Sequence, residues 1–236
     1  VSNVDQFMIS QYSQDSVGAI GNGVQVMNII IILLTVMSTA TTILIAQYLG
    51  AKNQEKISET CAVSLLINGV FSLIASILLL LFNQELFVWM QVPTEILADT
   101  CTYLRIVAYG ILFQGLYFSF VACFRGYSLM KTTMGVSIVM NLFNILGNWI
   151  LIYGLWIIPP MGVAGVAIST NISKILGLII IFILFKKYLG IKISKQHLFP
   201  LPWNLIKRML SISIPTGGEA LSYQLSQTTI MKMENV

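Results

Sequence analysis

The sequence has little charge, few cysteines and one histidine, and each scarcity excludes a class of protein. Only 9% of its 236 residues are charged, against about a quarter in soluble domains. Because 56% are hydrophobic, polar side chains could not cover a water-exposed surface, and lipid must be the solvent for much of the chain. The net charge of +4 comes without basic runs interleaved with aromatic residues, which argues against nucleic-acid binding.

The reactive and metal-binding side chains form no catalytic pattern. Cys61, Cys101 and Cys123 lack metal-like spacing, and their odd number argues against a disulfide framework. We interpret them as small apolar packing residues, and His197, among lysines, as a solvated side chain. Without a nucleophile–base pair, a metal cluster or a phosphate loop, we predict a protein that is not an enzyme and needs no cofactor or resident metal.

Long apolar stretches predict an all-α fold, a polytopic bundle of transmembrane helices. A span needs roughly 20 mostly apolar residues, so residues 1–10 are interpreted as the outer end of a truncated first helix. Six complete or nearly complete spans follow, at residues 17–49, 61–82, 101–124, 134–153, 163–185 and 212–231. These stretches are too continuous for amphipathic surface helices and too long for core strands.

The chain is expected to be a piece of a longer protein, since it begins without methionine and ends without a basic anchor. A longer connection with Gly190, Pro200 and Pro202 follows the sixth span and is typical of a boundary between bundles. The predicted parts are an N-terminal transmembrane lobe (1–188), a cytoplasmic linker (189–204) and the start of a C-terminal lobe (205–236).

Lysine and arginine occur on alternate connections only, which predicts the orientation of the chain. The connections after the second, fourth and sixth spans are basic, whereas the opposite ones contain no lysine or arginine. The basic residues are Lys52, Lys56, Arg125, Lys131, Lys186, Lys187, Lys192, Lys195, Lys207 and Arg208. Because basic connections are retained in the cytoplasm, we expect a multi-pass protein of the cell membrane whose first helix runs outward.

Polar side chains inside the spans carry the functional hypotheses, because a charge in the bilayer is costly. Asp5 lies either at the outer interface or within the first helix. Asn141, Asn144 and Asn148 share one face of the fifth helix, and they either bond to neighbouring helices or line a wet cavity. Lys174, near the middle of the sixth helix, must pair, face a cavity or lose its proton.

Two rows of small polar residues have packing explanations. One row in the sixth helix recurs at intervals of four and predicts close approach of a neighbouring helix. It consists of Gly165, Ser169 and Ser173, with Thr170 beside them. The other row, in the second helix, is interpreted mostly as hydroxyl groups that bond back to their own helix. It consists of Gln25, Asn28, Thr35, Thr39 and Thr42.

Short motifs occur along the chain in an order that matches one transporter family. They are Val4-Asp5, Gly50-Ala51, Tyr103-Leu104, Phe124-Arg125-Gly126, the Asn-Ile-Leu-Gly-Asn stretch at 144–148, Ile152-Tyr153-Gly154, residues 162–170 and Ile214-Pro215. Each motif is weak alone, but together they cover essentially the whole chain. The chain resembles the N-terminal half of multidrug and toxic compound extrusion (MATE) transporters.

The resemblance implies a fold and an activity. The fold would be the first six-helix lobe, with helix one truncated, plus helix seven of a two-lobe transporter. The activity would be antiport, the export of drugs or other organic, often cationic, compounds across the cell membrane in exchange for H⁺ or Na⁺. The expected partners are a small organic substrate, the lipid bilayer and the C-terminal lobe.

The resemblance also implies a coupling site. Asp5 falls on the helix-one aspartate implicated in cation coupling, where Na⁺ could bind, and Asn144 and Thr170 match its neighbours. Asn148 stands where many relatives have a second aspartate, and the loss of one carboxylate makes H⁺ the favoured ion. In helix seven, two further cavity-lining candidates follow the proline. They are Glu219 and, at the position where some members carry a coupling glutamate, Tyr223.

Two alternative functions stay open. A lipid-linked saccharide flippase of the same superfamily would need cationic residues in its cavity to bind a pyrophosphate, and Lys174 could serve. A non-transporting membrane scaffold is a third hypothesis, which the polar residues inside the spans disfavour.

The predicted orientation can be tested by thiol labelling in a background without the native cysteines. Lys52→Cys and Lys131→Cys should be protected from a membrane-impermeant reagent in intact cells, whereas Glu95→Cys should react, because lysine and arginine mark the cytoplasmic side. All three should react once the cells are permeabilised. Labelling of the Lys131→Cys protein in intact cells would contradict the orientation.

Overall fold

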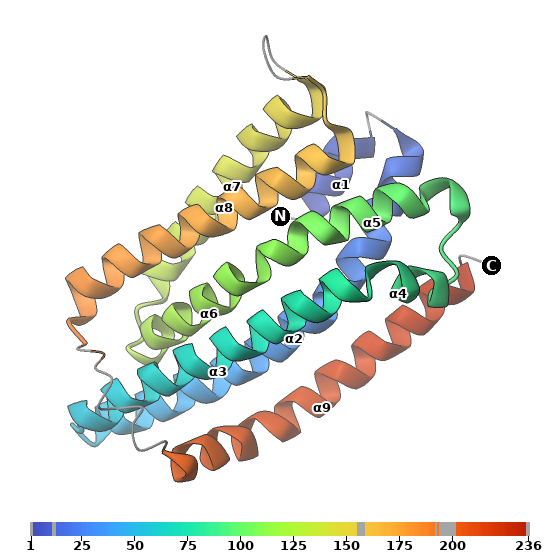
Figure 1. Cartoon of the computed structure of the whole chain (residues 1–236). Helices are drawn as coiled ribbons and strands as arrows, with labels where there is room; N and C mark the ends of the chain where they lie inside the picture. Colours follow the sequence, from blue (N-terminus) through green and yellow to red (C-terminus); the bar gives the residue numbers. More distant parts are fainter. Residues whose placement is uncertain (1, 11–12, 155–158, 192, 194–201, 235–236) are drawn as a thin grey trace.

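The computed structural model is a bundle of long helices (Figure 1) and describes residues 2–10, 13–154, 159–191, 193 and 202–234. Lipid offers no hydrogen-bond partners, so a chain of this composition satisfies its backbone groups inside helices. In chain order these are α1 (Ser2–Ser10), α2 (Gln14–Gly50), α3 (Gln54–Leu81), α4 (Asn83–Trp89), α5 (Thr94–Tyr109), α6 (Ile111–Gly126), α7 (Met130–Tyr153), α8 (Gly162–Leu184), the π-helical turn η1 (Phe185–Leu189) and α9 (Trp203–Glu234).

Most predicted spans are confirmed as membrane-length helices. Among the described residues, α2, α3, α7 and the continuous α8–η1 segment are each long and apolar enough to cross a bilayer, and α5 with α6 makes a fifth span if counted as one broken helix. The predicted seventh span differs. At 32 residues, α9 is long and begins at Trp203, but it is not among these spans, because Lys207, Arg208 and many serines, threonines and glutamines make it too polar.

The predicted helix at 101–124 is broken at Gly110, where α5 and α6 meet at an angle of 48°. The amide of Gly110 bonds to the carbonyl of Val107, three residues back, at 2.9 Å. The carbonyl of Ile106 accepts instead from Asn171 Nδ2 of α8, at 2.5 Å. A Cβ at Gly110 would collide with the Asn171 side chain. A side chain inserted into the hydrogen-bond ladder is a known cause of a kink.

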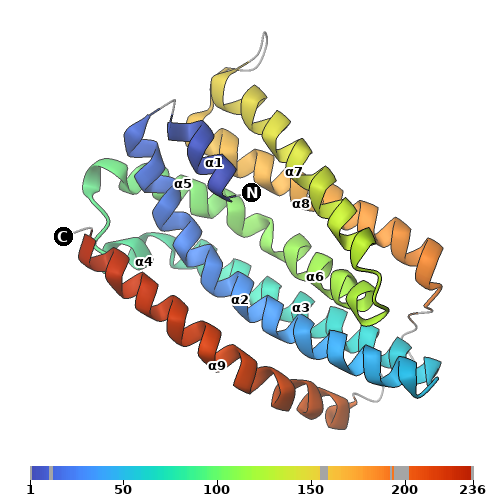
Figure 2. The ribbon, with the colours of Figure 1, turned by 180° about the vertical axis from the view of Figure 1, so that it is seen from behind.

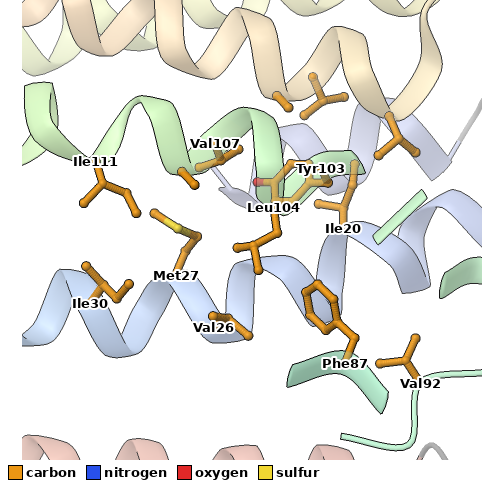
Figure 3. Close-up of a cluster of buried hydrophobic side chains, with 14 of the residues drawn as sticks. Ile20, Val26, Met27, Ile30, Phe87, Val92, Tyr103, Leu104, Val107 and Ile111 are labelled. Carbon is orange, nitrogen blue, oxygen red and sulfur yellow. The ribbon is translucent and has the colours of Figure 1, made fainter. Parts of the chain in front are cut away.

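The short helix α4 was not predicted, and it closes one end of the bundle. Figure 3 shows Phe87 of α4 and Val92 of the following turn pointing toward Leu104 of α5 and Ile20 of α2. Phe87, Ile20 and Leu104 are fully buried. The apolar side chains of this outer connection therefore extend the core of the lobe.

The basic connections meet at one end of the bundle, as the predicted orientation requires (Figures 1 and 2). The turn between α2 and α3, the turn between α6 and α7, the end of η1 and the start of α9 all lie there. Arg208 of α9 donates hydrogen bonds to Gln47 at 2.8 Å and Tyr48 at 3.3 Å, at the end of α2. From this end α9 runs back along α2, with Ser213 Oγ donating to the carbonyl of Val36 at 3.4 Å.

The cysteines are confirmed as free, and two of them meet across helices. Cys61 of α3 and Cys123 of α6 are both buried, with their sulfurs 2.8 Å apart. The threonine row of α2 also behaves as predicted. Thr35, Thr39 and Thr42 each donate to the carbonyl four residues back, at 2.7–3.0 Å.

The small-residue face of α8 packs against α7, as predicted. A Cβ on Gly165 would lie 2.6 Å from the carbonyl oxygen of Leu151, and one on Gly147 of α7 would collide with Ser169. Ser169 is 1% exposed, and its hydroxyl donates to the backbone carbonyl of Asn144 at 2.9 Å. The two helices can approach this closely only because these positions carry small side chains.

Replacing Ser169 by leucine should lower the unfolding temperature of the protein in detergent, because the larger side chain pushes α8 away from α7. Overpacking of this kind costs about 1–3 kcal/mol. Ile172→Leu is the matched control on the same helix, since Ile172 is 48% exposed and should tolerate the change. An unchanged unfolding temperature in Ser169→Leu would mean that α7 and α8 do not pack tightly here.

Candidate functional site

A cavity of about 230 Å³ lies inside the bundle, between α1, α2, α5, α6, α7 and α8. Aliphatic and methionine side chains form part of its wall, among them Met27 and Val107, which face each other in Figure 3. The polar lining residues are Asp5, Asn28, Tyr103, Gln114, Thr170, Ser173 and Lys174. They come from five different helices, so the folded lobe, rather than any local motif, creates the polar site.

Asp5 is the buried carboxylate of this cavity, with 1% of its surface exposed. Asn148 Nδ2 of α7 donates to Asp5 Oδ1 at 2.5 Å, and the Thr170 hydroxyl of α8 lies close enough to interact with this carboxylate. Figure 2 shows how α1 reaches these partners, because it lies between α2 and α7. Asp5 is therefore enclosed by protein and not exposed on the surface of the lobe.

The two asparagines of α7 that contact Asp5 or Thr170 each have an amide oxygen with no hydrogen-bond donor in the described part of the chain. Asn144 Nδ2 donates to Ser169 Oγ at 3.5 Å and Thr170 Oγ1 at 3.4 Å, while its own Oδ1 is unpartnered. Asn148 Oδ1 is likewise buried and unpartnered. Unsatisfied buried acceptors call for an explanation such as an ion or a water. A carboxylate with neutral oxygens around it suits a proton or a small hard cation.

Lys174 faces the same cavity from α8, one helical turn after Thr170. Its side chain is only 8% exposed, yet it has no hydrogen-bond or ion-pair partner among the described residues. It interacts electrostatically with Asp5 across the cavity. Of the predicted alternatives for Lys174, the structure therefore selects the cavity-facing one.

Sequence and structure comparisons identify the family. The family model described as MatE matches residues 1–150 of the chain. The chain belongs to the MATE family of membrane transporters. Membership of this family explains why the motifs occur in order along the whole chain. The family consists of transporters and not of enzymes.

The individual relatives are about twice as long as the chain. It is 36% identical over 230 residues to the uncharacterized transporter YisQ of Bacillus subtilis, covering 98% of this chain and 50% of YisQ. It is 26% identical over 216 residues to the probable multidrug resistance protein NorM of Thermotoga maritima, covering 91% and 46%.

A solved structure confirms the fold. It is the inward-facing conformation of a multidrug resistance MATE family transporter of the MOP superfamily, which superposes with a TM-score of 0.86 at 22% identity. The match covers 96% of this chain and 51% of that structure. The all-helical, polytopic lobe predicted from the sequence is thus the architecture of half a MATE transporter.

The predicted site residues are distributed unevenly over this MATE lobe. Asp5, Asn144, Asn148 and Thr170 come together, with Lys174 nearby. Asn141 is half-exposed and is not part of the cavity wall. Tyr223 on α9 is 67% exposed and also outside this cavity, and the side chain of Glu219 lies outside the described residues. A lining role for these three stays a prediction.

Sequence reasoning missed two polar cavity residues, Gln114 and Tyr103. Gln114 is an isolated polar residue in the apolar sequence of α6. Because burying an amide is costly, this position could have been predicted to face a polar cavity. Tyr103 was noticed only as part of a family motif. Its ring lies where a side chain at Gly23 of α2 would otherwise be, a contact that only the folded lobe reveals. Asn28, grouped with the threonines of α2, also belongs to the cavity wall.

Asn148→Ala should destabilise the MATE lobe, because the buried carboxylate of Asp5 loses its amide donor. The expected loss is about 1–3 kcal/mol, measured as a lower unfolding temperature in detergent. Asn141→Ala on the same helix is the control and should have little effect. In the double variant with Asp5→Ala, the loss caused by Asn148→Ala should shrink. Strict additivity would show that the two side chains do not interact.

Proposed function

We propose that the whole protein is a cation-coupled antiporter that exports organic compounds and uses Asp5 as its ion-binding carboxylate. The observation that carries this proposal is the enclosure of Asp5 at the wall of a cavity, with Asn148 as its amide donor. A carboxylate inside a membrane protein is costly, so its retention indicates a function. Relatives named as multidrug resistance proteins support organic solutes as the exported class.

Coupling follows from competition for Asp5. A ligand shifts an equilibrium between inward-open and outward-open states only through its different affinity for the two. A proton or Na⁺ on Asp5 removes or balances the charge that Asn148 and Thr170 solvate. A basic group of a substrate would need the same carboxylate in its ionised form. Because the two ligands exclude each other, each helps to release the other, and the result is exchange.

The proton is the favoured coupling ion. Asp5 is the single carboxylate on the described wall of this cavity, and in the described part of the chain no three histidine, cysteine or acidic side chains cluster as a metal site would need. One carboxylate is sufficient to carry a proton. Na⁺ would have to rely on Asp5 together with the free oxygens of Asn144 and Asn148, which are suitable neutral ligands.

The flippase alternative is weaker on electrostatic grounds. A lipid-linked pyrophosphate carries at least two negative charges, and Lys174 is the one cation among the described residues of the cavity wall. Asp5 on the same wall would repel the pyrophosphate. The exporter is therefore the better explanation of this arrangement.

The wider setting of the proposal follows from the sequence. The chain covers about half of each relative, so the substrate path would be completed by a C-terminal lobe, which α9 is expected to begin. We expect the protein in the cell membrane with its basic end in the cytoplasm, and the one-sided distribution of lysine and arginine supports this expectation.

Asp5→Asn in the whole transporter should preserve expression but abolish ion-driven efflux. In wild-type vesicles, efflux should rise as the outside is acidified, because inward proton movement drives it. The asparagine keeps the shape of the side chain but takes up no proton, so the pH dependence should disappear. Lys174 and Tyr103 are the other titratable groups facing Asp5, and both remain in this variant.

Asp15→Asn is the matched control, since Asp15 is exposed in the first turn of α2 and should leave efflux unchanged. Repeating the assay with and without Na⁺ identifies the ion. If Asp5→Asn exports substrate with an unchanged profile for both ions, Asp5 is structural and the proposal fails.

A further inference from the structure

Several hydrogen-bond donors line the same cavity as Asp5. The ammonium group of Lys174, the phenol of Tyr103 and the amides of Gln114 and Asn28 all line it, and none of them has a hydrogen-bond partner among the described side chains. Lys174, Tyr103 and Gln114 are each at least nine-tenths buried. Their donors open into the cavity and not onto acceptors in the described part of the protein, so this wall can receive an acceptor-rich group.

The charge of the cavity argues against a simple cation as its preferred ligand. Asp5 and Lys174 carry opposite charges and face the same space. Their fields oppose one another, so a purely cationic solute gains from Asp5 and loses to Lys174. A solute with one acidic and one basic group can place each beside the opposite charge.

We propose that this cavity selects zwitterionic organic solutes, with Lys174 binding their acidic group and Asp5 their basic group. Tyr103, Gln114 and Asn28 supply neutral donors to the same acidic group. The inference rests on the proposed function for the statement that such solutes are transported. The inference adds that the transporter recognises the acidic group of the solute, which an exporter of simple cations would not need to do.

Two versions of one fluorescent dye test the proposal by equilibrium binding to the whole transporter in lipid nanodiscs. A xanthene dye with a free benzoate is a zwitterion, and its methyl ester is a cation of nearly the same shape. Wild-type protein should bind the zwitterion more tightly than the ester. In Lys174→Met this preference should fall about tenfold, as expected for a lost hydrogen bond to a charged group, and the ester should bind as well or better.

Variants that keep or remove a charge elsewhere serve as controls. Lys174→Arg should retain the preference, and Lys187→Gln, which removes an exposed charge beyond α8, should not alter it. Gln114→Met removes one neutral donor and should lower the preference about threefold, which provides a second test if Lys174→Met does not fold. An unchanged preference in Lys174→Met, or in Gln114→Met should the first variant not fold, would overturn the proposal.

The binding assay separates this inference from the proposed function. If Asp5→Asn shows no loss of coupled efflux but Lys174→Met loses the dye preference, the coupling mechanism is wrong and the selectivity stands. If coupling is lost in Asp5→Asn but Lys174→Met binds both dyes as wild type does, the antiporter stands and zwitterion selection fails.

Discussion

A carboxylate enclosed at membrane depth must be solvated by the protein, because lipid supplies neither water nor hydrogen-bond donors. Asp5 meets this requirement through Asn148 of α7 and Thr170 of α8. These bonds attach the short α1 to helices more than a hundred residues away. The position of α1, the shape of the cavity and the accessibility of the carboxylate therefore depend on one another.

The close contact of α7 and α8 makes this solvation possible. Gly165 lets α8 approach the backbone of Leu151, and Gly147 accommodates Ser169. The Ser169 hydroxyl then bonds to the carbonyl of Asn144, so the small-residue face also carries part of the polar network. Packing between transmembrane helices relies on such contacts, since lipid gives no hydrophobic drive to associate. The packing of α7 against α8 and the polar network around Asn144 thus use the same few positions.

The sequence could predict the features that follow from hydrophobic periodicity and from the free-energy cost of placing polar groups in a membrane. It could predict little else. The length of the apolar stretches predicted the membrane spans, and the row of asparagines on one face of helix five predicted Asn144 and Asn148 as site residues. Both signals lie within a single helix and can therefore be recognised from the sequence. The kink at Gly110 arises from a side chain of α8, Asn171, and the cavity position of Gln114 depends on which helices surround α6. Such features are set by neighbours distant in sequence. The grouping around Asp5 was available only through family resemblance.

The opposite charges of the cavity also bear on the energetics of the proposed exchange. With Asp5 and Lys174 both charged, the pair is neutral, and a bound zwitterion leaves it neutral. With a proton on Asp5 the pair carries one positive charge, and moving one charge across the membrane potential is worth about 2.3 kcal/mol per 100 mV. A cell interior at negative potential would then favour the inward step of the protonated form and leave the outward step of the loaded form unaffected. The buried lysine thereby places the voltage dependence on the inward step of the protonated form, while the one charge moved per exchange of a proton for a neutral solute is the same with or without it.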